Sequence, residues 1–113
     1  MKIIPVDFTN LSYHAINDRA ARFNNIENSL GWGNPVASAI DKKDRTATAT
    51  LTDTGVIIIR NSQNMIVTAW FASVKQASDV WARSDNAGRI PSKLWNLLHY
   101  INNTYYWQSL VAA

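Results

Sequence analysis

The sequence contains no cysteine, only four glycines and three prolines, and no long apolar run. The lack of thiols excludes disulfides, zinc–thiolate centres and cysteine nucleophiles. Because the glycines stand only at positions 31, 33, 55 and 88, the chain has no glycine-rich phosphate-binding loop. No apolar stretch approaches the roughly 18 residues that a membrane-spanning helix needs. The opening segment MKIIPVDF is too short for a signal peptide, so any export takes another route or the chain is part of a longer protein.

Histidine is also scarce, because only positions 14 and 99 carry it. Their separation matches neither H-x-x-x-H nor H-E-x-x-H, so we expect no metal site and no cofactor. The sequence contains no nucleophile elbow, which disfavours a serine hydrolase. Eight acidic residues leave paired-carboxylate chemistry open, but nothing singles out a pair.

The composition is that of one globular domain. The chain has 113 residues, of which 47% are hydrophobic and 17% are charged. Its net charge is +3 and its pI about 9.5, which by itself favours a polyanionic partner only weakly. The basic segment DKKDR at 41–45 also contains acids, which is typical of a solvated loop.

The hydrophobic pattern predicts helices at both ends of the chain. Ile16, Ala20, Phe23 and Leu30 fall on one stripe of a helix that begins at Ser12, a residue suited to the N-cap position. Further helical segments are predicted at 35–40, where a proline suits the first helical position, at 73–84 and at 92–110.

The middle of the chain predicts three strands, at 45–52, 56–60 and 65–71. The first alternates threonine with apolar residues, whereas the second is continuously apolar and is expected to be central. We therefore predict an α+β domain in which N-terminal helices pack on one face of a small antiparallel sheet, with C-terminal helices following it.

An even loop at 61–64 places Thr68 and Trp70 on one face of this sheet, together with Thr46, Thr48 and Thr50. This mixed face is a candidate working surface, although threonine is also common on solvated strands because of its β propensity. The opposite face is apolar, and the helices are expected to cover it.

The positions of the basic residues on the first helix allow two interpretations. His14 and Arg22 lie on the polar side of the first helix, whereas Arg19 lies at the edge of its apolar stripe and must find a partner. These groups are ordinary surface or catalytic groups, and the pattern leaves both interpretations open. Arg60 faces away from Thr68 if the 61–64 loop is even, whereas an odd loop or a bulge brings the two together.

Three short segments carry a recurring bacterial pattern: HAINDRAAR at 14–22, GVIIIRN at 55–61 and IVTAW at 66–70. They resemble the small ribonuclease toxins of the barnase/EndoU/colicin E5/RelE superfamily. The resemblance covers residues 10–71 and leaves 72–113 as a helical C-terminal extension. The inner arginine of the family motif corresponds to Asp18 here, and Arg19 follows one position later.

The resemblance implies a metal-independent endoribonuclease toxin with tRNA as its expected substrate. In such an enzyme the 2′-hydroxyl attacks its own phosphate, which requires a general base, a cation and an acid for the leaving 5′-oxygen. The implied catalytic residues are His14, Arg19, Arg22, Arg60 and Thr68, and the implied substrate-binding residues are Trp70, Thr48 and Thr50.

The resemblance also implies partners and a location. An acidic immunity or antitoxin protein is expected to cover the basic cleft. The toxin is expected to act in the bacterial cytoplasm, delivered from another cell as part of a larger effector in bacterial competition. The alternative is a non-catalytic adaptor of a phage or toxin system that binds through the aromatic segment HYINNTYYWQSL at 99–110. Geometry discriminates between the two, because the enzyme needs His14, an arginine and Thr68 within reach of one phosphate.

Overall fold

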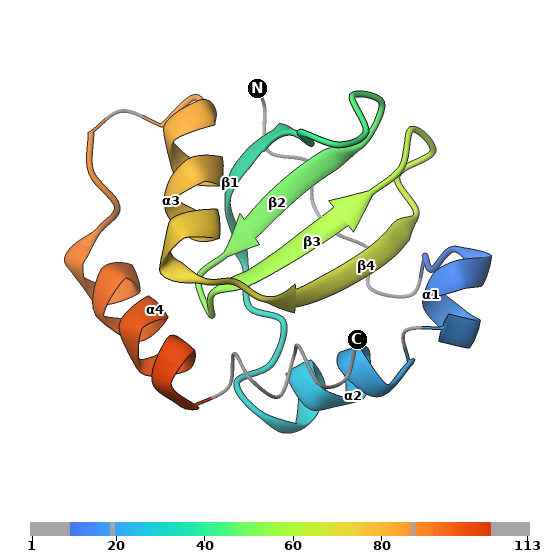
Figure 1. Cartoon of the computed structure of the whole chain (residues 1–113), viewed down its shortest axis with the longest axis horizontal. Helices are drawn as coiled ribbons and strands as arrows, with labels where there is room; N and C mark the ends of the chain where they lie inside the picture. Colours follow the sequence, from blue (N-terminus) through green and yellow to red (C-terminus); the bar gives the residue numbers. More distant parts are fainter. Residues whose placement is uncertain (1–9, 19, 87, 105–113) are drawn as a thin grey trace.

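A four-stranded antiparallel sheet lies at the centre of the fold, with helices on both sides of it (Figure 1). The structure, a computed structural model, describes residues 10–18, 20–86 and 88–104. The strands lie in the sheet in chain order, β1-β2-β3-β4, so each pairs with the next through a short connection. The prediction of an α+β fold built on an antiparallel sheet is confirmed.

The helices are α1 (Tyr13–Asp18), α2 (Ala20–Asn28), α3 (Val74–Arg83) and α4 (Ser92–Thr104). The strands are β1 (Pro35–Ile40), β2 (Thr48–Thr52), β3 (Val56–Arg60) and β4 (Ile66–Phe71). The three predicted strands correspond to β2, β3 and β4, and the helix predicted at 73–84 corresponds to α3.

The helical segment predicted at 35–40 is wrong, because these residues form the edge strand β1, paired antiparallel with β2. Proline suits the first residue of an edge strand as well as the first turn of a helix, so Pro35 did not discriminate. The alternation of Ala37 and Ala39 with Ser38 was the informative feature, since Ser38 faces the opposite side of the sheet.

The strand register defines two faces. The α3 face carries Ala37, Ala39, Ala49, Leu51, Ile57, Ile59, Thr68 and Trp70. The α2 face carries Ser38, Thr48, Thr50, Val56, Ile58, Arg60, Ile66, Ala69 and Phe71. Thr50 pairs with Ile58 and not with a residue of the Thr68 face. The prediction that Thr48 and Thr50 share a face with Thr68 and Trp70 is therefore wrong, because the β2–β3 hairpin has a register shifted by one residue.

A bulge at Val67 interrupts β4. Ile59 pairs with Thr68, but Arg60 pairs with Ile66, so Val67 is an extra residue on this strand. Ile66 therefore belongs to the α2 face although it lies only two residues before Thr68. Arg60 faces away from Thr68, which is the first of the two alternatives considered for it.

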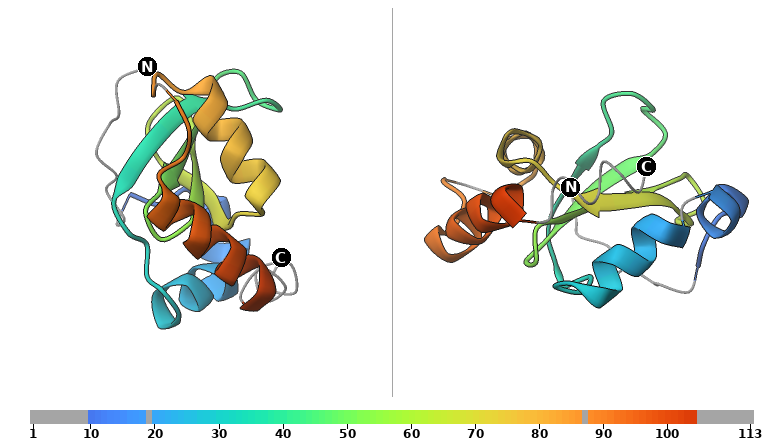
Figure 2. Two further views of the ribbon diagram at one scale, coloured as in Figure 1. Left: turned by 90° about the vertical axis from the view of Figure 1, so that its left-hand side faces the viewer. Right: turned by 60° about the horizontal axis from the view of Figure 1, so that its bottom comes forward.

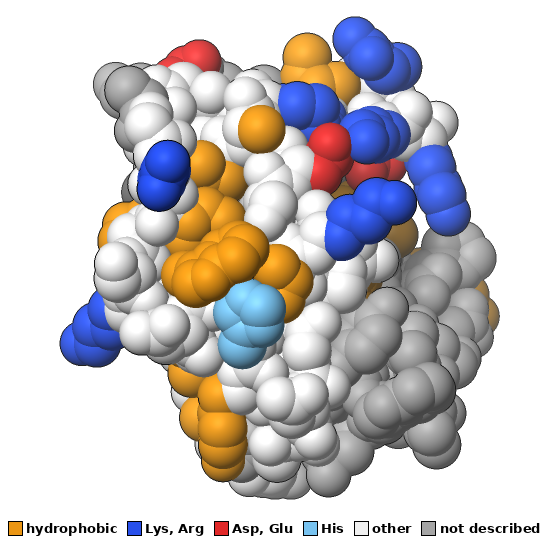
Figure 3. Space-filling view, turned by 60° about the vertical axis from the view of Figure 1, so that its left-hand side comes forward, with side chains coloured by type: hydrophobic (Ala, Val, Ile, Leu, Met, Phe, Trp, Pro, Cys, Tyr) orange, Lys and Arg blue, Asp and Glu red, His pale blue; other side chains and the backbone are white. Residues whose placement is uncertain are grey.

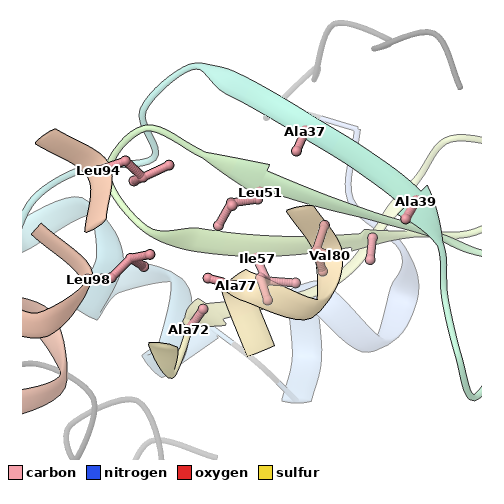
Figure 4. Close-up of a cluster of buried hydrophobic side chains, with 10 residues drawn as sticks. Ala37, Ala39, Leu51, Ile57, Ala72, Ala77, Val80, Leu94 and Leu98 are labelled. Atoms are coloured by element: carbon pink, nitrogen blue, oxygen red, sulfur yellow. The ribbon is translucent and has the colours of Figure 1, made fainter. Parts of the chain in front are cut away.

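Helix α3 packs on β1 and β2 through small residues. Ala37, Ala39 and Ala49 are all buried there, and Ala77 and Val80 of α3 pack against them (Figure 4). Because alanine methyl groups take little space, the helix axis can approach the sheet closely. The serine that precedes α3, Ser73, closes a capping box with Gln76, as is typical of a well-defined helix start.

Helices α1 and α2 cover the opposite face, as the right-hand view of Figure 2 shows. Ala15, Phe23 and Ile26 are buried against a cluster that includes Ile58 and Phe71. The helix predicted to begin at Ser12 is right in its location, but the structure has two helices there, α1 and α2, and one residue of the predicted apolar stripe is misplaced. Ile16, assigned to the apolar stripe, is 58% exposed, and the neighbouring Ala15 is buried instead.

The predicted cap of the first helix is confirmed, because the Ser12 Oγ accepts a hydrogen bond from the Ala15 N–H at 3.2 Å. The backbone just before this helix adds a parallel bridge beside β4, with Leu11 paired to Ile66. The N-terminal helices are thus tied to the start of β4.

Helix α4 closes one end of the sheet and contributes to both clusters, with Leu98 in one and Ile101 in the other. The Asn102 side chain holds it there, because its Oδ1 accepts from the Val74 N–H at 3.1 Å and its Nδ2 donates to the Ala72 carbonyl at 3.1 Å. The predicted helix 92–110 is borne out for 92–104, and its remainder lies outside the described residues. Within those residues no helix has the length and apolar character that crossing a membrane requires.

Two glycines with the same backbone conformation differ in the space around them, so substituting each distinguishes the cost of backbone strain from the cost of a steric clash. Gly55 and Gly88 have φ values of +82° and +81°, but only at Gly55 would a Cβ collide, lying 2.5 Å from Ile101 Cδ1. We expect Gly88→Ala to lower the free energy of unfolding by about 1 kcal/mol, and Gly55→Ala by about 2–4 kcal/mol. Urea denaturation of both variants measures the difference, and equal losses would contradict the packing of α4 on the β2–β3 turn.

Candidate functional site

An open groove of about 820 Å³ lies on the α3 face, beside the helix. It exists because α3 packs mainly on β1 and β2 and leaves part of this face of β3 and β4 uncovered among the described residues. Ile57 and Ile59 line it together with Thr68 and Trp70, two of the residues predicted from the sequence to bind or act on a substrate.

Charged side chains surround the groove. Four basic and two acidic residues line it: Lys42, Lys43, Lys75, Arg83, Asp41 and Asp79. Figure 3 shows Lys and Arg side chains gathered around acidic ones on this part of the surface, apart from an apolar patch beside a histidine. The groove therefore combines an apolar and aromatic floor with a rim that is positive on balance.

An ion-pair network links the two sides of this rim. The Asp79 carboxylate of α3 contacts Lys42 Nζ at 2.9 Å and Arg83 Nε at 3.0 Å. Arg83 is further held by its Nη1, which donates to the Ile40 carbonyl at the end of β1. The hydrogen bond from Lys42, followed by the effects of Arg83, lowers the pKa of Asp79 against the opposing effect of desolvation. Asp79 is therefore a carboxylate at neutral pH.

Trp70 is held in a fixed orientation. Its indole Nε1 donates to Gln76 Oε1 at 3.1 Å, and the same oxygen accepts the Ser73 N–H at 3.0 Å. The Gln76 N–H in turn donates to Ser73 Oγ at 3.1 Å. The residues that start α3 thus also position the indole, which leaves a half-buried aromatic ring on the groove. A ring fixed in this way loses little side-chain entropy when a flat ligand stacks on it.

The structure divides the predicted site residues between the two faces. Thr68 and Trp70 line the groove, whereas Arg60, Thr48 and Thr50 lie on the α2 face. The sheet itself separates the two sets, so they do not line one cleft. Their predicted roles in a single phosphate site are incompatible with this arrangement unless the backbone rearranges.

Arg60 is part of a buried polar chain that crosses three strands. It is 1% exposed, and its Nη2 donates to Thr50 Oγ1 at 2.9 Å. That hydroxyl is also hydrogen-bonded to Ser38 Oγ at 3.0 Å. Burial lowers the pKa of the guanidinium, which remains protonated because arginine does not titrate in the accessible range. These contacts support a structural role for Arg60 and Thr50 in joining β1, β2 and β3.

The basic residues of the first helix are placed by their backbone. His14 lies on α1 and Arg22 on α2, and both helices pack against β4, the strand that carries Thr68. Arg19 lies outside the described residues. The N-terminal helices are thus neighbours of the groove strand, although their described contacts are on its α2 face.

Sequence reasoning missed the basic residues that surround the groove. Lys42 and Lys43 were assigned to a solvated loop, and Lys75 and Arg83 fell within the predicted helix 73–84 with no role assigned to them. All four side chains are exposed, and the tertiary fold is what brings them together around one groove. A usable signal was present in α3, where positions 75, 79 and 83 recur every four residues and so share one side of the helix.

The described residues contain no group of three or more histidine, aspartate or glutamate side chains arranged to hold a metal ion. Comparison of the chain with protein-family models, curated proteins and solved structures finds no match. The chemistry of the site therefore has to be argued from its residues.

The buried polar chain generates a stability prediction. Thr50→Val removes the hydroxyl that accepts from Arg60 Nη2 and bonds to Ser38 Oγ, both in buried residues, so we expect a loss of about 1–3 kcal/mol in the free energy of unfolding. Thr48→Val is the matched control, since Thr48 lies two residues away on the same face and is half-buried. We expect it to change stability by less than about 0.5 kcal/mol. A Thr50→Val protein as stable as wild type would refute the structural role of this chain.

Proposed function

We propose that this domain is a metal-independent endoribonuclease that binds single-stranded RNA, with tRNA as the expected target, in the groove beside α3. The observation that carries the proposal is the meeting of Trp70, Thr68 and four basic side chains around one open surface. The resemblance of residues 10–71 to ribonuclease toxins supports the same reaction.

Each part of the groove suits one part of a nucleotide. The fixed indole of Trp70 offers an aromatic face on which a base can stack. Lysines at the rim attract the phosphate backbone, and the Thr68 hydroxyl can donate to a phosphate oxygen. A base inside a duplex is already stacked between its neighbours, so the arrangement favours single-stranded segments such as tRNA loops.

The reaction needs no metal. A base takes the proton of the 2′-hydroxyl, the 2′-oxygen attacks phosphorus, and the bond to the 5′-oxygen breaks as that oxygen receives a proton. The products are a 2′,3′-cyclic phosphate and a free 5′-hydroxyl. In the proposal His14 is the proton-transfer group, because an imidazole titrates near neutrality. Its helix α1 packs against the edge strand β4 from the α2 face, so the RNA backbone has to cross this edge of the sheet to bring a phosphate from the groove to His14. Rim lysines stabilise the charge that develops on the phosphorane.

The proposal includes an inhibitor. An acidic immunity or antitoxin protein would complement the basic rim and exclude RNA from the groove. The toxin would then act in the cytoplasm of a bacterium that lacks this inhibitor.

The adaptor alternative has one observation in its favour. Of its aromatic segment 99–110 the structure describes residues 99–104, in which Tyr100 is 51% exposed. Trp95, earlier in α4, is 40% exposed and lines a second pocket together with Trp81 and Ile90. The ring of His99 contacts Trp95 edge-on, with centroids 4.8 Å apart. This apolar patch would bind a protein partner, whereas the basic groove would then be ordinary surface.

RNA binding by the groove is tested with a fluorescent single-stranded 2′-O-methyl oligonucleotide, which cannot be cleaved. We expect Trp70→Leu to weaken binding by about 5- to 150-fold, because it removes a stacking ring worth about 1–3 kcal/mol while keeping an apolar side chain. Fluorescence anisotropy measures the affinity.

Trp95→Leu is the control for this test, since it removes a more exposed indole from the second pocket. We expect it to leave oligonucleotide affinity unchanged. If Trp95→Leu weakens binding and Trp70→Leu does not, the groove is not the RNA site and the adaptor surface becomes the leading candidate.

Cleavage is tested by incubating the purified protein with total tRNA in EDTA. We expect discrete fragments that end in 2′,3′-cyclic phosphate, and we expect His14→Ala to lower the cleavage rate by at least about 100-fold. If the purified protein binds the oligonucleotide but leaves tRNA intact, the proposed catalysis is refuted and the proposed binding site stands.

A further inference from the structure

Asp79 occupies an unusual position for a residue of an anion-binding groove. Its two oxygens contact the rim cations Lys42 and Arg83 at 2.9 and 3.0 Å. A carboxylate in this position competes directly with a phosphate for the same donors, and its negative charge repels the ligand.

The two cations differ in how firmly they are held. Arg83 also donates to the Ile40 carbonyl, so it bridges α3 to the end of β1 independently of Asp79. Lys42 lies on the β1–β2 loop, and its side chain is 64% exposed. The ion pair with Asp79 ties this lysine to α3. Exposed lysine–carboxylate pairs of this kind are weak and exchange readily.

We propose that Asp79 is an internal competitor for the RNA backbone, from which Lys42 transfers to a phosphate when the ligand enters the groove. This inference rests on the proposed function, since it concerns the same groove. Asp79 thereby sets the specificity of the site, because one phosphate must replace the carboxylate that Lys42 already has.

As a consequence, the groove selects ligands by the number of phosphates that they carry. A mononucleotide exchanges one anion for another at Lys42 and gains only the stacking on Trp70. An oligonucleotide also reaches Lys43 and Lys75, which line the same groove. These further contacts release counterions and offset the loss of the Lys42–Asp79 pair. The groove therefore favours a polymer over free nucleotides.

The test compares Asp79→Asn with Glu27→Gln, using the uncleavable 2′-O-methyl oligonucleotide. Both substitutions raise the net charge by one. Glu27 lies on α2, away from the groove, and a glutamine there keeps an oxygen that can accept the Trp32 indole N–H. We expect Asp79→Asn to tighten binding by about 3- to 10-fold and to steepen the salt dependence by about 0.7 in log K against log salt concentration, the contribution of one freed cation on a single strand. We expect Glu27→Gln to match wild type.

A double-mutant cycle isolates Lys42. In the wild-type background we expect Lys42→Ala to change affinity by less than about 2-fold, because Lys42 leaves one anion to reach another. In the Asp79→Asn background we expect the same substitution to weaken binding by about 3- to 10-fold. Equal effects in both backgrounds would overturn the transfer of Lys42, and a Glu27→Gln protein that gains as much as Asp79→Asn would overturn the role of Asp79.

The outcomes also separate this inference from the proposed function. If the wild type binds the oligonucleotide and Asp79→Asn binds it equally well or more weakly, the inference is wrong and the proposed RNA site stands. Absence of oligonucleotide binding by both proteins would overturn the proposed function together with the inference. Thermal unfolding of each variant, followed by circular dichroism, verifies that the compared proteins are folded.

Discussion

The close packing of α3 on β1 and β2 determines where this molecule has an accessible surface. Three alanines of the sheet, Ala37, Ala39 and Ala49, allow the helix to approach, and α3 starts beside the end of β4 and packs mainly on β1 and β2. Side chains at its start and along one side then become the wall of the groove. The same contact that builds the core thus places Gln76, Asp79 and Arg83 next to Trp70 and Thr68. A longer helix, or larger residues at the alanine positions, would remove the groove or change its width.

The sheet also has a polar interior on its other face, and this was the least predictable part of the molecule. Arginine at the end of an apolar strand resembles a surface residue, and a threonine-rich strand resembles a solvated one. In the fold Arg60 and Thr50 are buried together, and each satisfies part of the other's hydrogen bonding. Buried polar groups of this kind hold a strand register, because a shift by one residue would expose them to apolar neighbours.

Local sequence patterns predicted most of the architecture but only part of the candidate site. Alternation and apolar runs located β2, β3 and β4, an apolar stripe with a serine cap located α1, and the hydrophobic pattern located α3. Thr68 and Trp70 were identified as exposed polar and aromatic positions on a strand. Two things were not local. The β2–β3 register decides which threonines accompany them, and it depends on packing against both helix layers. The cations of the rim come from a loop and a helix whose meeting only the tertiary fold creates.

The bulge at Val67 gives β4 two separate tasks. Residues two apart on a regular strand share a face, so Ile66 and Thr68 would be bound to the same surroundings. The extra residue breaks this link, and Ile66 anchors the N-terminal helices while Thr68 and Trp70 face the groove. Substitutions before the bulge therefore affect the packing of the N-terminal helices, whereas substitutions after it affect the groove. Over evolution the groove-facing side chains of β4 can change while Ile66 is kept, because the bulge places the two sets of side chains in different surroundings.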